Sequence, residues 1–336
     1  MQTSSSKLPR CLLAAILLAL LSMVLSAASG AQSSGVFLPP PPTCPPWWPP
    51  GATVKDHTIA HDNGYYWLIA MKSDLEESQD TFICAQSEDL CHWEYRGEVL
   101  HTGGPGTWNE EAIWAPYLLK EQEQWYMFYT GVTPAICQSI FLATSDDPGG
   151  ASSWMDQGVV FQPSHPDIIW SGGDHWSDCR DPMVLKVDDT YYMYYTASCL
   201  EGGCIAVATS STLMGPWEDE GPIYVAATGM PESPFVLERE GVYYLFFNNI
   251  GEQYATATDP RGPWQDRGIL RVEGAKGLVV WANEFLQVEG EWITSFLISG
   301  YSVFVRWLGW NENDSPPEPF VIWPLVSNVY LPLVVK

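Results

Sequence analysis

One pattern recurs along this chain and constrains its fold more than any other feature. Aromatic residues follow turn residues and open alternating apolar segments, and the clear pairs are Tyr65-Tyr66, Trp125-Tyr126, Tyr191-Tyr192 and Tyr243-Tyr244. A weaker fifth copy has only Trp292, after Glu289-Gly290-Glu291. Alternation that starts at a turn is typical of a β-strand entering a hairpin. The chain is therefore predicted to repeat one β-unit along its length.

Two further markers follow the first four pairs, always in the same order. The first is Ala-Gln-Ser at Ala85, Ala-Thr-Ser at Ala143 and Ala208, and Ala-Thr-Asp at Ala257. The second is Trp-x-x-x-Gly, which runs from Trp93 to Gly97, Trp154 to Gly158, Trp217 to Gly221, and Trp264 to Gly268. Four antiparallel strands in roughly 45–60 residues are typical of a propeller blade. We predict an all-β, five-bladed β-propeller with blades near 53–104, 105–171, 172–225, 226–275 and 276–326.

The two ends of the chain differ from the repeats. Residues 1–31 carry positive Lys7 and Arg10, an apolar run from Cys11 to Leu25 and small residues before Gln32, which is the pattern of a secretory signal peptide. Residues 32–52 form a Pro-rich linker, and the propeller occupies 53–326. The apolar tail 327–336 is either a ring-closing strand or an export-related tail. We expect a secreted protein.

Seven cysteines follow the predicted cleavage site, and an oxidising compartment favours disulfides. Cys84 with Cys91, and Cys199 with Cys204, have spacings that suit local links across a hairpin. Cys137 with Cys179 is a candidate third bridge between adjacent repeats. Cys44 is then left over in the Pro-rich segment, and no spacing of cysteine and histidine indicates zinc. Six cysteines allow 15 pairings, so these connectivities are hypotheses.

Net charge and aromatic content limit the classes of partner that the chain is expected to bind. The net charge is −25, and such an acidic surface repels nucleic acid and anionic lipid. We therefore expect neither a nucleic acid nor a membrane partner. The chain has 17 Trp and 16 Tyr, and these residues offer flat apolar surfaces that suit sugar-like ligands. A neutral carbohydrate is the expected partner.

Three acids occupy nearly the same place in three repeats. Counted back from the aromatic pairs, Asp56 lies nine residues before Tyr65, Asp181 ten before Tyr191, and Glu232 eleven before Tyr243. In the second repeat Ala115 takes this place, next to Trp114. The first strand of a propeller blade lines the axis, so these side chains are expected to meet at one mouth. The alternatives are acids that only cap turns and a Trp114 that belongs to the core.

Three carboxylates around one axis repel one another, and such an arrangement favours a catalytic site. Glycoside hydrolysis uses one protonated acid for the leaving oxygen and a carboxylate that activates water or attacks the anomeric carbon. A third carboxylate raises the pKa of the acid by proximity. Trp114 supplies a flat face for the C–H side of a sugar.

These residues resemble glycoside hydrolase family 43. The resemblance rests on Asp56-His57-Thr58-Ile59, Trp114-Ala115-Pro116, Arg180-Asp181-Pro182 and Glu232-Ser233-Pro234, and it covers residues 53–310. Families 32 and 68 share the same five-bladed superfamily. The resemblance implies that Asp56 is the general base of an inverting enzyme, Asp181 tunes the acid and Glu232 is the general acid. It also implies arabinosides, xylosides or related furanosides and galactosides of plant polymers as substrates.

The chain departs from these families in several places. The family 32 signature Trp-x-Asn-Asp-Pro-Asn-Gly is absent around Asp56, which argues against a fructosidase. His57 stands where Pro is common. Many family 43 members keep a fifth-blade His near a calcium ion, yet residues 280–285 contain none. We therefore expect no cofactor and find no support for a central calcium. Arg306 is a candidate sugar contact in blade five.

The sequence thus predicts a secreted, monomeric glycoside hydrolase that cleaves arabinose- or xylose-type bonds by inversion. Three alternatives stay open: a retaining fructosidase-like enzyme, a carbohydrate-binding propeller without catalysis, and a propeller that binds proteins.

Overall fold

The computed structural model describes residues 44–73, 79–150, 153–172, 175–298 and 302–323. All of them belong to one compact unit that lies within residues 40–336. The predicted signal peptide, the linker up to residue 43 and the tail 327–336 lie outside the described residues. Within these ranges, no helix has the length and apolar character needed to cross a membrane.

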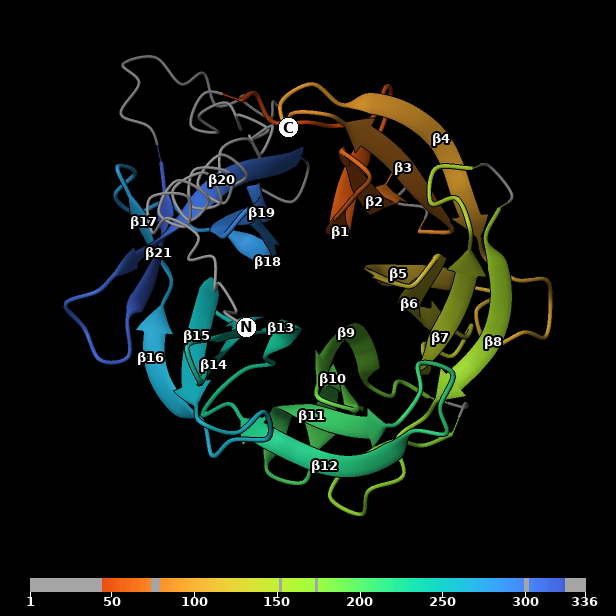
Figure 1. The fold of residues 1–336 in the computed structure, drawn as a ribbon. Helices are drawn as coiled ribbons and strands as arrows, with labels where there is room; N and C mark the ends of the chain where they lie inside the picture. The colour runs from red at the N-terminus through yellow and green to blue at the C-terminus, as the bar shows by residue number, and fades with distance from the viewer. Residues whose placement is uncertain (1–43, 74–78, 151–152, 173–174, 299–301, 324–336) are drawn as a thin grey trace, which may run out of the picture. The chain divides into compact units, whose positions relative to one another are not determined.

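The described chain consists of β-strands arranged in five sheets (Figure 1). The first three sheets contain β1 (Thr53–Asp62), β2 (Tyr65–Ser73), β3 (Thr81–Ser87) and β4 (Glu94–His101); β5 (Ala112–Glu121), β6 (Gln124–Val132), β7 (Gln138–Ser145) and β8 (Met155–Phe161); and β9 (Cys179–Val187), β10 (Thr190–Cys199), β11 (Gly202–Ser210) and β12 (Glu218–Val225). The other two contain β13 (Glu232–Arg239), β14 (Val242–Asn248), β15 (Glu252–Ala257) and β16 (Gln265–Ile269); and β17 (Arg271–Glu273), β18 (Trp281–Val288), β19 (Glu291–Ile298), β20 (Ser302–Asn311) and β21 (Glu318–Ile322).

Each sheet is one blade with four antiparallel strands in chain order, and the fifth sheet has β17 in addition, so the predicted five-bladed propeller is confirmed. The first strands β1, β5, β9, β13 and β18 contact one another in sequence, and β18 also contacts β1. Figure 1 shows these strands nearest the centre and β4, β8, β12 and β16 at the periphery. Blade five differs from the prediction by one strand, because β17 pairs in parallel with β21 at its outer edge.

The sequence markers have clear structural positions. The aromatic pairs open β2, β6, β10 and β14, and the Trp-x-x-x-Gly tryptophans directly precede the outer strands. In the first blade the pairing register shifts between Cys84 and Ala85, opposite Gly97, which has a φ of 110°. Such a bulge needs a residue that tolerates positive φ, which explains the glycine of this marker.

The segment before β1 packs where blade five meets blade one. The backbone N–H of Trp47 donates to the carbonyl of Val303 at 2.9 Å, and the N–H of Val303 donates back at 2.9 Å. Trp47 also covers a buried apolar cluster that contains Val54 of blade one and Leu297 of blade five. The C-terminal part of the Pro-rich linker is therefore part of the folded unit.

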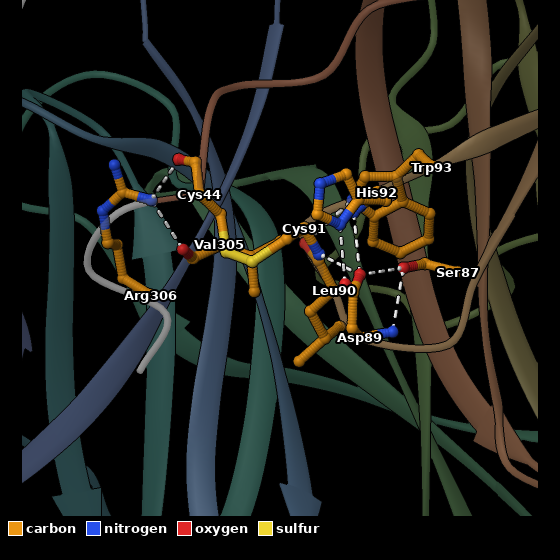
Figure 2. The surroundings of a disulfide bond; sticks show 9 residues. All are labelled: Cys44, Ser87, Asp89, Leu90, Cys91, His92, Trp93, Val305 and Arg306. Atoms are coloured by element: carbon orange, nitrogen blue, oxygen red, sulfur yellow. Dashed lines mark hydrogen bonds and ion pairs between the residues drawn. A yellow bond between two sulfur atoms is a disulfide. The ribbon is translucent and has the colours of Figure 1, made fainter. Parts of the chain in front are cut away.

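A disulfide fixes this segment, and it corrects one predicted pairing. Cys44 is bonded to Cys91, not left over, and Cys84 is not a partner of Cys91 (Figure 2). Cys84 lies in the middle of β3 with its side chain in the core beside blade two, whereas Cys91 lies in the turn after that strand. The predicted Cys199–Cys204 bond is confirmed. The proposed Cys137–Cys179 bridge is not among the disulfides of the described residues.

Candidate active site

The inner strands share one irregularity, and it organises the site. In each of them the pairing with the second strand shifts by one residue near the strand start. The bulge residues that follow from this pairing are Asp56, Ala115, Asp181, Ser233 and Ala282, and the last four have φ between 45° and 56°. Backbone strain at a repeated position is typical of functional sites. The bulges thus present five equivalent residues at the same end of the blades.

These bulges line one pocket at the axis. Its lining residues are Asp56, His57, Ala115, Pro116, Asp181, Pro182, Ser233, Pro234, Ala282 and Glu284. The empty volume, including the open mouth, is about 300 Å³. Two of the predicted acids, Asp56 and Asp181, lie in its wall.

Glu232 occupies a different place from the other two acids. The pairing of β13 with β14 makes Ser233 the equivalent of Asp181, so Glu232 is equivalent to Arg180 and to Trp114. Its side chain is 47% exposed, against 8% for Asp181. The structure therefore brings the three predicted acids together, with Asp56 and Asp181 in the pocket wall and Glu232 at the rim.

Asp56 faces the charges of the other acids. Burial raises the pKa of this carboxyl well above the usual range, and the negative charges of Asp181 and Glu232 raise it further. Lys55 and Arg180 act in the opposite direction. Half-buried Asp56 is thus a stronger proton acceptor, once ionised, than an Asp on the surface.

Asp181 is held by hydrogen bonds to residues of three blades. Its Oδ2 accepts from the backbone N–H of Ser233 at 2.9 Å and from the hydroxyl of Thr196 at 3.2 Å. Its own N–H donates to Thr130 Oγ1 at 3.0 Å. Burial raises the pKa of Asp181, Arg180 lowers it and Glu232 raises it, with a net upward shift. The residue is fixed in place between its neighbours.

Arg180 connects Glu232 to a buried polar group, and this role was not predicted from the sequence. Its Nη2 donates to Glu232 Oε1 at 2.7 Å, while Nη1 donates to Asp178 Oδ1 and, at 3.1 Å, to Gln138 Oε1. The guanidinium is 9% exposed and Asp178 is 5% exposed. A planar guanidinium bonded on both sides holds the carboxylate of Glu232 in one orientation. The Arg-Asp-Pro motif was the available signal for Arg180.

Glu284 adds a fourth carboxyl group at the axis, and it was not predicted from the sequence. Glu284 of β18 accepts a hydrogen bond from Thr58 Oγ1 at 3.2 Å, and Thr58 Oγ1 accepts from the N–H of Leu118 at 3.2 Å. Burial raises the pKa of Glu284 well above its usual range, and Asp56 adds to this. The fifth repeat was the most degenerate one, so its acid had no aligned counterpart.

His57 follows Asp56 at the place that prolines take in blades two to four. Its Nε2 lies 2.8 Å from the hydroxyl oxygen of Ser295. Burial lowers the pKa of His57 to about 3, so the ring is uncharged near neutral pH. It contributes shape and a hydrogen bond to the pocket, and no charge.

Two predicted sugar contacts lie elsewhere. Trp114 packs against the core around Ile113 and Phe141, and only its neighbours Ala115 and Pro116 line the pocket. Arg306 is 4% exposed, donates to the carbonyl of Cys44 at 3.4 Å and lies over the ring of Trp323 (Figure 2 shows its bond to Cys44). Burial of Arg306 favours a structural role, whereas Trp114 is half-buried at the position equivalent to Glu232, so its sugar contact stays a prediction.

Within the described ranges, no group of three or more His, Cys, Asp or Glu side chains is arranged to hold a metal ion. The expectation about cofactors stays a prediction.

Known proteins are similar to this chain in sequence and in fold. Residues 51–176, the first two blades, match the family model of glycosyl hydrolases family 43. A β-D-galactofuranosidase of Aspergillus niger is 23% identical over 248 residues, or 68% of each chain. A probable arabinan endo-1,5-α-L-arabinosidase C of Aspergillus clavatus is 34% identical over 123 residues, or 35% of this chain and 34% of its own. The chain thus spans about a third of the length of that relative.

The fold comparison extends over the whole propeller. The crystal structure of a thermostable family-43 glycoside hydrolase aligns with a TM-score of 0.64 and 19% identity, over 83% of this chain and 96% of its own. The alignment therefore includes the blades that carry Asp181 and Glu232, which the family match does not reach. The chain is thus a glycoside hydrolase on a five-bladed propeller, similar to glycosyl hydrolases family 43 in the sequence of its first two blades and in its fold.

Proposed function

We propose that this glycoside hydrolase cleaves arabinose- or xylose-type bonds by an inverting single displacement. One observation carries the proposal: carboxyl groups from four inner strands gather at the axis, with Asp56, Asp181 and Glu284 in the pocket wall and Glu232 held beside it by Arg180. A substrate with its terminal sugar in the pocket and the rest of its chain outside places the scissile oxygen at that rim.

Each acid has a distinct task in this mechanism. Glu232, in its protonated form, gives its proton to the glycosidic oxygen as the bond from that oxygen to the anomeric carbon breaks. Asp56, ionised, removes a proton from a water molecule whose oxygen attacks the anomeric carbon from the opposite face. Asp181 lies between Asp56 and Glu232, where its negative charge acts on both carboxyl groups. Glu232 is then ionised and Asp56 protonated, so the enzyme is restored when Asp56 loses its proton to solvent and Glu232 takes one up from solvent.

The substrate class follows from pocket and surface. The pocket at the axis is small, so it suits at most one terminal sugar ring. The net charge of −25 disfavours anionic sugars such as uronates. The names of the Aspergillus relatives describe enzymes for furanosides, which supports a pentofuranoside such as arabinofuranose as the first substrate to try.

We also propose secretion and a monomeric state. The N-terminal sequence has the pattern of a signal peptide. The Cys44–Cys91 and Cys199–Cys204 disulfides support an oxidising destination.

The test is a panel of nitrophenyl glycosides together with arabinan and xylan oligosaccharides, followed by NMR of the first-formed product. The expected result is turnover of a pentoside with inversion at the anomeric carbon. Retention would replace the single displacement by a covalent route through Asp56. Sugar binding without any turnover would make the chain a carbohydrate-binding propeller and overturn the proposal.

A further inference from the structure

An exposed apolar cluster lies beside the proposed acid. We name it the apolar rim, and it consists of Ile169, Trp176 and Leu200, which are 53%, 61% and 67% exposed. Large apolar side chains that remain this exposed together indicate a binding surface. Two of them belong to the connection from β8 to β9, and Leu200 belongs to the turn after β10.

Hydrogen bonds connect all three residues to the end of β10. The N–H of Ile169 donates to the carbonyl of Ser198 at 2.7 Å, and the N–H of Leu200 donates to the carbonyl of Asp167 at 3.0 Å. The Cys199–Cys204 disulfide closes the turn that carries Leu200. The hydroxyl of Ser198 donates to Asp178, the same residue that accepts from Trp176. The three residues of the apolar rim are thus all anchored at the end of β10.

Three hydrogen bonds connect the indole of Trp176 to the proposed acid. Trp176 Nε1 donates to Asp178 Oδ1 at 2.9 Å, Arg180 Nη1 donates to the same oxygen, and Arg180 Nη2 donates to Glu232 Oε1 at 2.7 Å. Asp178 and Arg180 are both buried, so the connection is rigid. The polar edge of the indole is satisfied inside the protein, and its apolar faces remain available to a ligand.

We propose that the apolar rim binds the leaving-group part of the substrate, with Trp176 stacked on the C–H face of the sugar that follows the scissile bond. This inference rests on the proposed function. A general acid lies on the leaving-group side of the bond that it protonates. The surface tied to Glu232 is therefore the surface that the departing sugar covers. Burial of an indole face against sugar C–H groups is favourable because both surfaces leave water.

Three variants test the apolar rim. Trp176→Ala removes the platform, Trp176→Phe keeps an aromatic face without the hydrogen bond to Asp178, and Trp48→Ala removes another exposed tryptophan, 52% exposed, on the segment before β1. The substrates are a linear arabinotriose and arabinofuranosyl fluoride, or the matching pair for the sugar that the panel selects. Fluoride departs without covering the apolar rim, so the pair separates leaving-group binding from the rest of the reaction.

We expect Trp176→Ala to lower kcat/KM for the trisaccharide about tenfold more than for the fluoride, mainly through KM. Trp176→Phe should recover most of this loss, and Trp48→Ala should behave as wild type on both substrates. An equal loss on both substrates indicates a merely structural role for Trp176 and overturns the inference. Wild-type values on the trisaccharide overturn it too, while the proposed function stands. Absence of wild-type turnover on both substrates instead refutes the proposed function, and the inference with it.

Discussion

The three predicted acids differ in what surrounds them, and this difference supports the tasks that we propose for them. Asp56 and Asp181 line the pocket itself, where burial raises the pKa of each. Glu232 stands half-exposed at the rim on Arg180. A base that activates water belongs inside, beyond the bound sugar, and an acid belongs where the leaving group departs. The assignment therefore follows from position as well as from sequence.

The pH dependence of hydrolysis tests the role of Asp56. Asp56 must be ionised to accept a proton, so kcat/KM falls as the pH drops through its pKa. The negative charge of Asp181 is one cause of the raised pKa. In Asp181→Asn that charge is absent, and we expect the acidic limb of the normalised pH profile to move to lower pH, on top of a loss of activity.

Asp188→Asn is the matched control for this experiment. It removes the same charge from the exposed turn at the other end of β9, where φ is 53° and Asn is tolerated. Its pH profile should equal that of wild type. An acidic limb that stays in place in Asp181→Asn would show that Asp56 is not the group that titrates there.

Glu252 makes the stability of the fold depend on pH. It opens β15, is 1% exposed, and burial raises its pKa well above the usual range. Between the unfolded pKa of about 4.3 and the higher folded pKa, the folded chain keeps this proton and the unfolded chain has lost it. Stability is therefore complete at low pH and falls as the pH rises, by at most about 1.4 kcal/mol per pH unit for this group.

We expect Glu252→Gln to reduce the loss of stability at higher pH, because the amide has no proton to release. Urea unfolding at pH 5 and pH 8 measures the free energy of unfolding of both proteins. The loss of stability from pH 5 to pH 8 should be smaller in the variant than in wild type. Exposed Glu291→Gln should change neither value. A destabilisation by Glu252→Gln that is equal at both pH values would contradict the prediction.

At the scale of elements, the segment before β1 is the least expected part of the structure. It connects blades five and one through Trp47 and Val303 and is bonded to the turn after β3 through Cys44–Cys91. The bond closes a loop of 47 residues in sequence, and a disulfide of this span stabilises typically by about 2–4 kcal/mol. The first blade is thus held to its neighbour by a segment outside its own sheet.

Cysteine variants test this connection. Cys44→Ser and Cys91→Ser should each lower the free energy of unfolding by a similar amount, about 2–4 kcal/mol, and the double variant should lose no more than either one. Cys84→Ala should add its own loss to that of Cys91→Ser, because it removes only a buried thiol. Additive losses for Cys44 and Cys91, measured by urea unfolding, would contradict the pairing.

The bulge in the inner strands explains why residue spacing located the acids in the sequence but did not give the exact position of Glu232. Counting from the aromatic pairs placed Asp56, Asp181 and Glu232 in the same region, because strand lengths are conserved between blades. The count grew from nine to eleven residues, and only the pairing of β13 with β14 shows that Glu232 precedes the bulge. A one-residue offset moves a side chain to a different environment.

At the scale of the whole molecule, the fold was predictable because its information is local and repeated. The turns, the alternating strands and the Trp-x-x-x-Gly marker each lie within one hairpin. Their recurrence in four repeats made the prediction of a propeller secure. The contacts that were missed join distant segments: Arg180 with Glu232, Thr58 with Glu284 and Cys44 with Cys91. They exist only once the ring is closed, so no pattern within a single blade reveals them.

The most direct test of the account is the activity of Glu232→Gln on an arabino-oligosaccharide, measured as released reducing sugar. Gln keeps the shape of Glu232 and cannot give a proton to the glycosidic oxygen. We expect kcat to fall by about 10²–10⁴, with substrate binding retained, and a smaller fall for a dinitrophenyl glycoside, whose leaving group needs little protonation. Near-wild-type hydrolysis of the oligosaccharide by Glu232→Gln would contradict the central claim.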